Sequence, residues 1–276
     1  MDKRFVGAVL IALMAVAVIT VPGVLGRRLT GSAAPALHVN PPLEIGNCLG
    51  PLNTPQELNT IVDVVPVVAC TRAHSAEVIA VGRIDPVDYP VRPTVADAAF
   101  TSGPLSEQCD QAAAKFLGWG TKNTVPRIQV SFFTRLTIPG ELEWRLGQRW
   151  YACELMPGVL DYPISYDGTA QNASFRTPPD AFANCADGPG ETRISCREPH
   201  HAEQLTSSYG KSAGGDGNCR ALVAKVIGTS DPTFNGQLAV LSRVQGGASQ
   251  CWVTTTSSRY LTATLINHGS RPLPLQ

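Results

Sequence analysis

One eight-residue pattern occurs twice in the chain and constrains its architecture more than any other feature. It has the form C-x-x-x-H-x-A-E and occupies Cys70–Glu77 and then Cys196–Glu203. Around each copy the cysteines recur in the same order and divide into two sets of four: Cys48, Cys70, Cys109 and Cys153, then Cys185, Cys196, Cys219 and Cys251. Self-similarity of this kind indicates a tandem duplication, so the sequence predicts two units of the same architecture.

The even number of cysteines in each set indicates disulfide bonds. Small β-rich units bury a limited core, and disulfides stabilise such units outside the cytosol. Four cysteines allow three pairings in each unit, and the sequence alone does not choose among them. We expect the first cysteine to pair with the second and the third with the fourth, which gives Cys48–Cys70, Cys109–Cys153, Cys185–Cys196 and Cys219–Cys251.

The same segments contain the residue types of a thiol hydrolase or of a zinc site. An imidazole can take the proton of a thiol, and Cys, His and Glu side chains can all bind zinc. Both kinds of site need a free thiolate, whereas every cysteine here has a potential partner. The sequence also has no C-x-x-C pair and no H-E-x-x-H motif. We therefore expect no catalytic residue, no bound metal and no cofactor.

The four polar side chains of the repeated motif, His74, Glu77, His200 and Glu203, have two further interpretations if the cysteines are bonded. In one, each His and Glu forms local hydrogen bonds with loop carbonyls and backbone N–H groups. In the other, they form a polar binding loop, because binding residues concentrate on loops. The sequence leaves both interpretations open.

The N-terminal segment has the length of a membrane span. Residues 5–26 carry no charge and lie between Lys3-Arg4 and Arg27-Arg28. As a helix this run would extend roughly 33 Å, about the thickness of the hydrocarbon core. It is longer than the apolar region of a cleaved signal peptide. We therefore expect a cytoplasmic tail at 1–4, an uncleaved signal anchor at 5–26 and an extracytoplasmic remainder, with secretion after cleavage as the alternative.

The rest of the chain is expected to be α+β. Proline-rich linkers are predicted at 27–42 and 158–182, and two disulfide-bonded units at 43–157 and 183–276, each a mostly antiparallel sheet with one helix. The hydrophobic patterns predict helices at 105–117, with Ser106 as N-cap, and 218–227, and strands at 61–70, 77–84, 127–136, 141–153, 238–244, 250–256 and 260–266. Pro66 marks the first of these strands as an edge strand or a bulge.

Charge argues against one class of partner. Past Arg28 the chain has 18 basic and 21 acidic residues, a net charge of 18 − 21 = −3. A nucleic-acid-binding domain normally carries a basic patch, so we expect no nucleic acid as partner.

The first unit resembles the septum formation domain, which occurs in actinobacterial membrane and secreted proteins. The resemblance rests on Gly46-Asn47-Cys48-Leu49, on the segment from Val67 to Val78, on the following helical Cys109, and on Trp144-Arg145-Leu146-Gly147-Gln148-Arg149 before Cys153. Residues 183–256 are a more diverged second copy, in which Val244-Gln245-Gly246-Gly247 replaces the tryptophan segment. The resemblance brings no catalytic residues.

The resemblance and the N-terminal segment together predict a membrane-anchored protein of the cell envelope, possessing no enzymatic activity and linked to septum formation in cell division. The expected partners are the membrane, through residues 5–26, and a cell-wall polymer or another division protein. The alternative function is an extracytoplasmic metal-binding protein or thiol hydrolase that uses the two Cys-His-Glu segments.

Overall fold

The computed structural model describes residues 39–52, 66–94, 103–119, 127–158, 164–209, 216–245 and 248–276. Residues Asn40–Gln276 form one compact unit. The predicted tail and signal anchor, and most of the first predicted linker, lie outside the described residues. No helix within the described ranges is long and apolar enough to cross a membrane.

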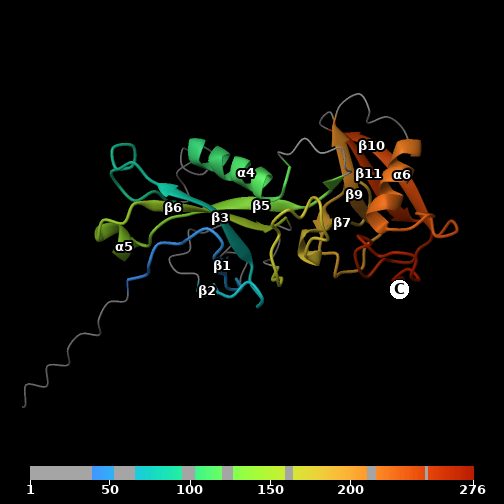
Figure 1. The fold of residues 1–276 in the computed structure, drawn as a ribbon, viewed down its shortest axis with the longest axis horizontal. Helices are drawn as coiled ribbons and strands as arrows, with labels where there is room; N and C mark the ends of the chain where they lie inside the picture. The colour runs from blue at the N-terminus through green and yellow to red at the C-terminus, as the bar shows by residue number, and fades with distance from the viewer. Residues whose placement is uncertain are drawn as a thin grey trace, which may run out of the picture. The chain divides into compact units, whose positions relative to one another are not determined.

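The first half contains a five-stranded sheet. Its strands run in the order β2-β1-β3-β6-β5, and all neighbouring pairs are antiparallel. Helix α4 (Pro104–Phe116) packs on β3, β5 and β6, and Figure 1 shows it along one face of the sheet. The strands are β1 (Cys48–Leu49), β2 (Val67–Val68), β3 (Ala76–Arg83), β5 (Phe132–Thr137) and β6 (Trp150–Pro157).

The second half contains a sheet in the order β10-β11-β9-β7-β8, and its strand pairs are likewise antiparallel. Helix α6 (Asp216–Ile227) packs on β9, β10 and β11. The strands are β7 (Asn184–Ala186), β8 (Arg193–Ile194), β9 (Ala202–Tyr209), β10 (Leu238–Gln245) and β11 (Ala248–Thr255).

The two sheets have one topology. In each half a short hairpin (β1-β2 or β7-β8) precedes a long central strand, then a helix, then a second hairpin (β5-β6 or β10-β11) whose last strand pairs with the central strand. The structure therefore has the two disulfide-bonded, mostly antiparallel α+β sheets that the sequence predicts.

The halves are joined by backbone pairing and by a shared core. Strand β4 (Arg127–Ile128) comes from the first half of the chain and pairs with β9, placing Ile128 opposite Thr206. The amide of Ser131 also donates to the carbonyl of Phe182 at 2.8 Å. One hydrophobic cluster includes core side chains of both halves, Leu155 and Leu205 among them.

The segment 164–182, expected to be a linker, is packed into this core. Tyr166, Ala170, Ala173 and Phe182 are all buried, and the short 3₁₀ helix η1 (Asp180–Phe182) leads directly into β7. Burial of these side chains distinguishes the segment from a solvated connection. The residues 159–163 before it are outside the described ranges.

Helix α4 confirms the predicted helix but begins earlier than expected. Its N-cap is Gly103, not Ser106, because Pro104 at the first helical position has its φ already fixed near the helical value. Gly118 follows the helix with φ +87°, and a Cβ there would lie 2.6 Å from the Phe175 ring. Both the backbone angle and the close ring therefore require glycine at this position.

Two strand predictions are wrong in part, and a third is wrong. The start of 141–153 forms helix α5 (Glu141–Arg145), a short turn that buries Glu143 and Trp144. The predicted strand at 127–136 is divided into β4 and β5, which belong to different sheets. Residues 260–266 form no strand, since only isolated bridges pair Leu261 with His200 and Leu275.

The first predicted strand, 61–70, is described only from Pro66 onward. Within it the strand is the two-residue β2, which lies at the edge of the first sheet. A proline has no N–H to donate to a sheet, so an edge position agrees with the expectation for Pro66.

Candidate functional site

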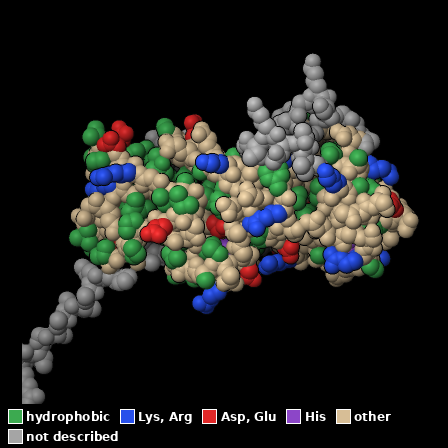
Figure 2. Space-filling view, in the orientation of Figure 1, with side chains coloured by type: hydrophobic (Ala, Val, Ile, Leu, Met, Phe, Trp, Pro, Cys, Tyr) green, Lys and Arg blue, Asp and Glu red, His purple; other side chains and the backbone are tan. Residues whose placement is uncertain are grey.

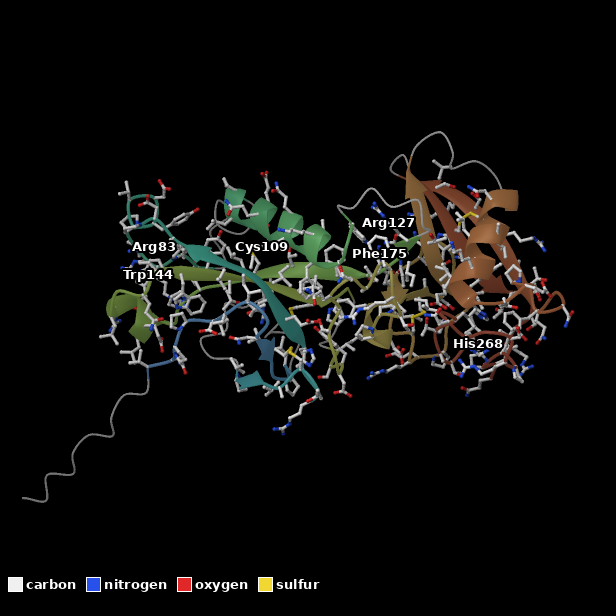
Figure 3. All side chains as sticks on the ribbon, in the orientation of Figure 1. Arg83, Cys109, Arg127, Trp144, Phe175 and His268 are labelled. Carbon is white, nitrogen blue, oxygen red and sulfur yellow. A yellow bond between two sulfur atoms is a disulfide. The ribbon has the colours of Figure 1, made fainter. Side chains whose placement is uncertain are left out.

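All eight cysteines form disulfide bonds, in the pairs expected from their order: Cys48–Cys70, Cys109–Cys153, Cys185–Cys196 and Cys219–Cys251. In each half one bond joins the first hairpin to the repeated motif, and the other joins the helix to the last strand of the sheet. Figure 3 shows Cys109 on α4 over the sheet. No thiol is free in this form, so neither half contains a thiolate that could act as nucleophile or metal ligand.

His74 is completely buried beside Tyr166, with the two ring centroids 4.2 Å apart. Its Nδ1 lies 2.8 Å from the carbonyl oxygen of Arg72. A carbonyl oxygen can only accept, so we assign the imidazole hydrogen to Nδ1. The Nε2 atom is buried and has no hydrogen-bond partner among the described residues.

Glu77 projects from β3 and binds a segment far along the chain. Its carboxylate accepts hydrogen bonds from Tyr166 Oη at 3.1 Å, from the Ala170 amide at 2.6 Å and from Thr169 Oγ1. Burial raises the pKa of Tyr166 well above its ordinary value, and the nearby Glu77 carboxylate raises it further. Tyr166 therefore stays a neutral donor, and Glu77 fixes the segment 166–170 against the central strand.

The second half repeats this arrangement. His200 Nδ1 donates to the carbonyl of Glu198 at 2.8 Å, while Glu203 accepts from the Leu265 amide at 2.7 Å and from Thr264 Oγ1. Burial lowers the pKa of His200, and the charge of the adjacent His201 also lowers it.

The pKa of Glu203 is raised to about 7, mainly because the carboxyl group is fully buried. The hydrogen bonds from Thr264 and Leu265 oppose this effect, and the charge of Asp180 adds to it. The Glu203 carboxyl group, with its pKa of about 7, therefore changes charge near neutral pH.

The four candidate residues therefore lie in the interior. The exposed fractions are 0% for His74, 3% for Glu77, and 0% for both His200 and Glu203. Their hydrogen bonds go to nearby loop carbonyls and to segments that each carboxylate holds in place. Burial of all four side chains favours a structural role over a polar binding loop. The histidine bonds are local, as one interpretation expects, whereas the donors to Glu77 and Glu203 lie at least 61 residues further along the chain.

A matching pair of segments supplies these donors, and neither segment belongs to a motif predicted from the sequence. Thr169 and Thr264 each begin a T-x-x-N segment, ending at Asn172 and Asn267. Both asparagines have positive φ, 58° and 54°, and their amides donate to the last turns of α4 and α6 respectively. Figure 3 labels Phe175 and His268, which lie just beyond these segments.

The T-x-x-N recurrence was the signal that could have located these donors. Each Thr lies three residues after the position that bridges to the motif histidine, Tyr166 in the first half and Leu261 in the second. Each half therefore includes its own T-x-x-N segment, the first of which lies inside the predicted linker 158–182.

A second buried carboxylate lies outside the repeated motif. Glu154 on β6 has an exposed fraction of 0% and pairs with Arg135 on β5, at 2.8 Å from Nε and 2.6 Å from an Nη atom. Thr137 Oγ1 donates to the other oxygen. Both charges are compensated, so this pair holds two neighbouring strands and offers no free acid or base.

These features define a class of protein: a disulfide-bonded α+β protein of two joined sheets, in which a repeated His–Glu motif holds the interior together. The profile of the family described as Septum formation matches residues 46–212, more than half of the chain. The chain belongs to the septum formation family, which confirms the resemblance seen in the sequence. The single match extends into both halves and does not separate two copies, so the two-copy interpretation stays a prediction.

No curated protein and no solved structure matches the chain significantly. The family assignment and the structure are therefore the two foundations for a functional proposal.

Proposed function

We propose that the protein is a non-catalytic binding or scaffold protein of the cell envelope that acts in septum formation. In this proposal residues 5–26 anchor it in the cell membrane, and the two disulfide-bonded halves lie outside. Membership of the septum formation family supports the process, and the 22 uncharged residues at 5–26 support the anchor. The four disulfides support the compartment, because disulfides persist in oxidising environments.

One observation carries the non-catalytic part of the proposal. Every cysteine is bonded, and His74, Glu77, His200 and Glu203 are buried in contacts that stabilise the fold. A thiol hydrolase needs a free thiol, a base beside it and access for a substrate. The repeated motif offers none of these together in its oxidised form.

The surface supports a protein or wall-polymer partner over a nucleic acid. Figure 2 shows Lys and Arg side chains interspersed with Asp and Glu on the face in view, without a continuous basic patch. Together with the net charge of −3 past Arg28, this arrangement lacks the electrostatic attraction on which phosphate-backbone binding depends.

Crosslinking in dividing cells tests the partner. The full chain, carrying an affinity tag after Gln276, would be crosslinked in its native host, purified under denaturing conditions and analysed by mass spectrometry for proteins and wall fragments. We expect division proteins or wall polymer to be enriched over a control chain that has residues 1–26 and an unrelated extracytoplasmic domain. Equal recovery from both chains would contradict the binding role.

A reporter fusion tests the anchor and the side of the membrane. Alkaline phosphatase, which becomes active only after export, would be fused after Gln276. We expect activity in the membrane fraction, and loss of activity when residues 5–26 are deleted. Activity in the culture medium would show that the segment is cleaved, and absence of activity in the intact fusion would place the halves in the cytoplasm.

A further inference from the structure

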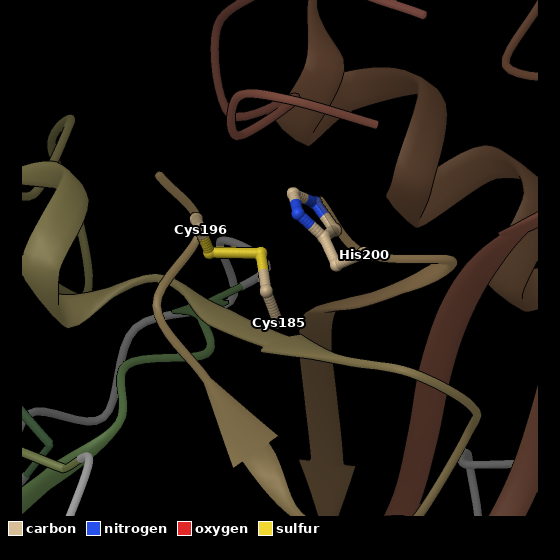
Figure 4. Close-up of side chains that lie close together, drawn as sticks. All are labelled: Cys185, Cys196 and His200. Carbon is tan, nitrogen blue, oxygen red and sulfur yellow. A yellow bond between two sulfur atoms is a disulfide. The ribbon is translucent and has the colours of Figure 1, made fainter. Parts of the chain in front are cut away.

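The second half brings two sulfur atoms and an imidazole together in the interior. A ring nitrogen of His200 and the Sγ atoms of Cys185 and Cys196 all lie within 4.8 Å of one another. Figure 4 shows the imidazole beside the disulfide bond. The three side chains have exposed fractions of 0%, 0% and 1% for His200, Cys185 and Cys196. In the described part of the chain, no other set of three His, Cys, Asp or Glu side chains is grouped this closely.

His200 has the hydrogen-bond arrangement of a metal ligand. Its Nδ1–H donates to the Glu198 carbonyl at 2.8 Å, so Nε2 carries a lone pair. That Nε2 is buried and has no hydrogen-bond partner among the described residues. A buried polar atom without a partner requires an explanation. Metal-binding histidines commonly donate one ring N–H to a backbone carbonyl while the other nitrogen binds the metal.

We propose that the reduced chain binds a zinc ion through Cys185, Cys196 and His200, and that the disulfide replaces this zinc site on oxidation. The thiols are the state in which the chain is synthesised, so the site needs no reductant to form. Two thiols bind Zn²⁺ as thiolates and release two protons. With a neutral imidazole the complex carries no net charge, which favours its burial.

The change in geometry between the two states is small. At Zn–S distances of about 2.3 Å in a tetrahedral arrangement, the two sulfur atoms would lie roughly 3.8 Å apart. Rotation of the two cysteine side chains can open the bonded pair to this separation while the backbone of β7 stays in place. The fourth coordination position is left for a water molecule.

Oxidation removes the zinc in a balanced step. A disulfide-containing oxidoreductase accepts two electrons from the two thiolates, and its two sulfur atoms take up two protons as its disulfide is reduced to two thiols. The Cys185–Cys196 bond forms and Zn²⁺ leaves. Zinc would thus hold the correct two sulfurs together beforehand, in a chain whose eight cysteines allow 105 pairings.

The first half provides a matched control within the same molecule. Cys48, Cys70 and His74 occupy the equivalent positions, and His74 Nε2 also lacks a partner. These three residues are all described, yet their ligand atoms do not come within the same distance of one another. The proposal therefore assigns one zinc ion to the chain and not two.

The test is a zinc measurement on the full chain, kept reduced and without oxygen in detergent micelles. After incubation with Zn²⁺ and removal of unbound metal, zinc per chain is counted, and Co²⁺ substitution reports thiolate ligation through its charge-transfer absorption. The double variant C185S/C196S and the variant H200A are compared with C48S/C70S and H74A.

We expect one zinc ion per chain in the wild type and in both first-half variants, and none in C185S/C196S or in the oxidised protein. H200A should weaken binding more than about tenfold, the lower limit for losing even an outer-shell contact. Because buried substitutions can unfold a protein, zinc protection from alkylation is mapped in the wild type as well. Absence of zinc, or protection of Cys48 and Cys70 equal to that of Cys185 and Cys196, would overturn the proposal.

Discussion

Glu203 is a carboxyl group without exposure to solvent, and its charge has a measurable effect on stability. Its pKa is raised to about 7 by burial, against an ordinary value of 4.5. Between these two pH values the native state holds the proton that the unfolded chain has lost. The contribution of this group to the free energy of unfolding is therefore fully present below pH 4.5, and is lost as the pH rises toward 7 and above.

We expect Glu203→Gln to remove this dependence, because an amide does not titrate. The wild type minus variant difference in unfolding free energy should fall by on the order of 3 kcal/mol from pH 4.5 to above 7. Denaturant titrations across this range measure it, and the subtraction cancels the opposite contribution of His200, whose lowered pKa favours the native state as pH rises. Thr264→Val, which removes a hydrogen bond that lowers the pKa, should extend the loss to higher pH. A pH-independent difference for Glu203→Gln would contradict the assignment.

The buried pair of Arg135 and Glu154 makes a second prediction. Arg135→Leu leaves the carboxylate of Glu154 buried without its cation, and should destabilise the protein by about 3–5 kcal/mol. Replacing both residues by leucine should cost less than the single change, because no unpaired charge remains.

The exposed pair of Arg145 and Glu141 is the matched control. The side chains are 74% and 56% exposed, and Nε lies 2.8 Å from the carboxylate. Arg145→Leu should cost about 0.5 kcal/mol or less. Chemical denaturation of the three variants measures these differences, and equal costs for Arg135→Leu and Arg145→Leu would show that the interior pair is solvated.

The disulfides close loops of different lengths. Cys109–Cys153 has a sequence separation of 44, against 11 for Cys185–Cys196. If the bonds act mainly on the entropy of the unfolded chain, removing Cys109–Cys153 should destabilise the protein by about 1 kcal/mol more than removing Cys185–Cys196. Paired Cys→Ala variants, unfolded by denaturant without reductant, measure the difference. A larger loss for the shorter loop would show that native-state packing around Cys185 and Cys196 dominates.

The sequence predicts elements whose signal is local. The helices at 105–117 and 218–227 could be predicted because their apolar side chains recur at helical spacing, and the structure confirms both helices. The disulfide pairs could be predicted because the cysteines are few and recur in the same order, and the structure confirms these pairs as well. Helix α5 was missed because Glu141–Arg145 is a single turn whose alternating polarity also fits a strand. Short segments contain too few residues to distinguish the two periods.

The donors to the two motif carboxylates could not be predicted from neighbouring residues. Thr169 and Thr264 lie 92 and 61 residues after Glu77 and Glu203, their acceptors. A T-x-x-N pattern has only two fixed positions, so it becomes informative only when the two halves of the structure are compared. The burial of His74 and His200 was equally hidden, because a polar residue beside a loop is exposed in most proteins.

The molecule as a whole makes a prediction about where its first half ends. The segment 164–175 supplies the donors to Glu77 and the contacts at the end of α4, although it follows the last strand of the first sheet. A chain of residues 40–157 lacks this segment, whereas a chain of residues 40–182 contains it. We expect the longer fragment to be the more resistant to proteolysis when both are oxidised.

A point variant of the longer fragment distinguishes the effect of the Thr169–Glu77 hydrogen bond from the effect of fragment length. Thr169→Val in the 40–182 fragment removes one donor to Glu77 and should lower the fragment's resistance to proteolysis. The control Gln171→Ala changes an exposed side chain that does not bond to Glu77, so it should leave the resistance unchanged. Equal resistance of the two fragments would place the end of the unit at residue 157.

The separation of 92 residues between Glu77 and Thr169 also fixes a delay between their synthesis. A ribosome adds about 5–20 residues per second, so Thr169 follows Glu77 out of the ribosome after roughly 5–20 s. During that interval the Glu77 carboxylate lacks this donor, although both Cys48 and Cys70 have already been made. The Cys48–Cys70 disulfide can therefore form before the segment 166–170, which buries Glu77, has been synthesised.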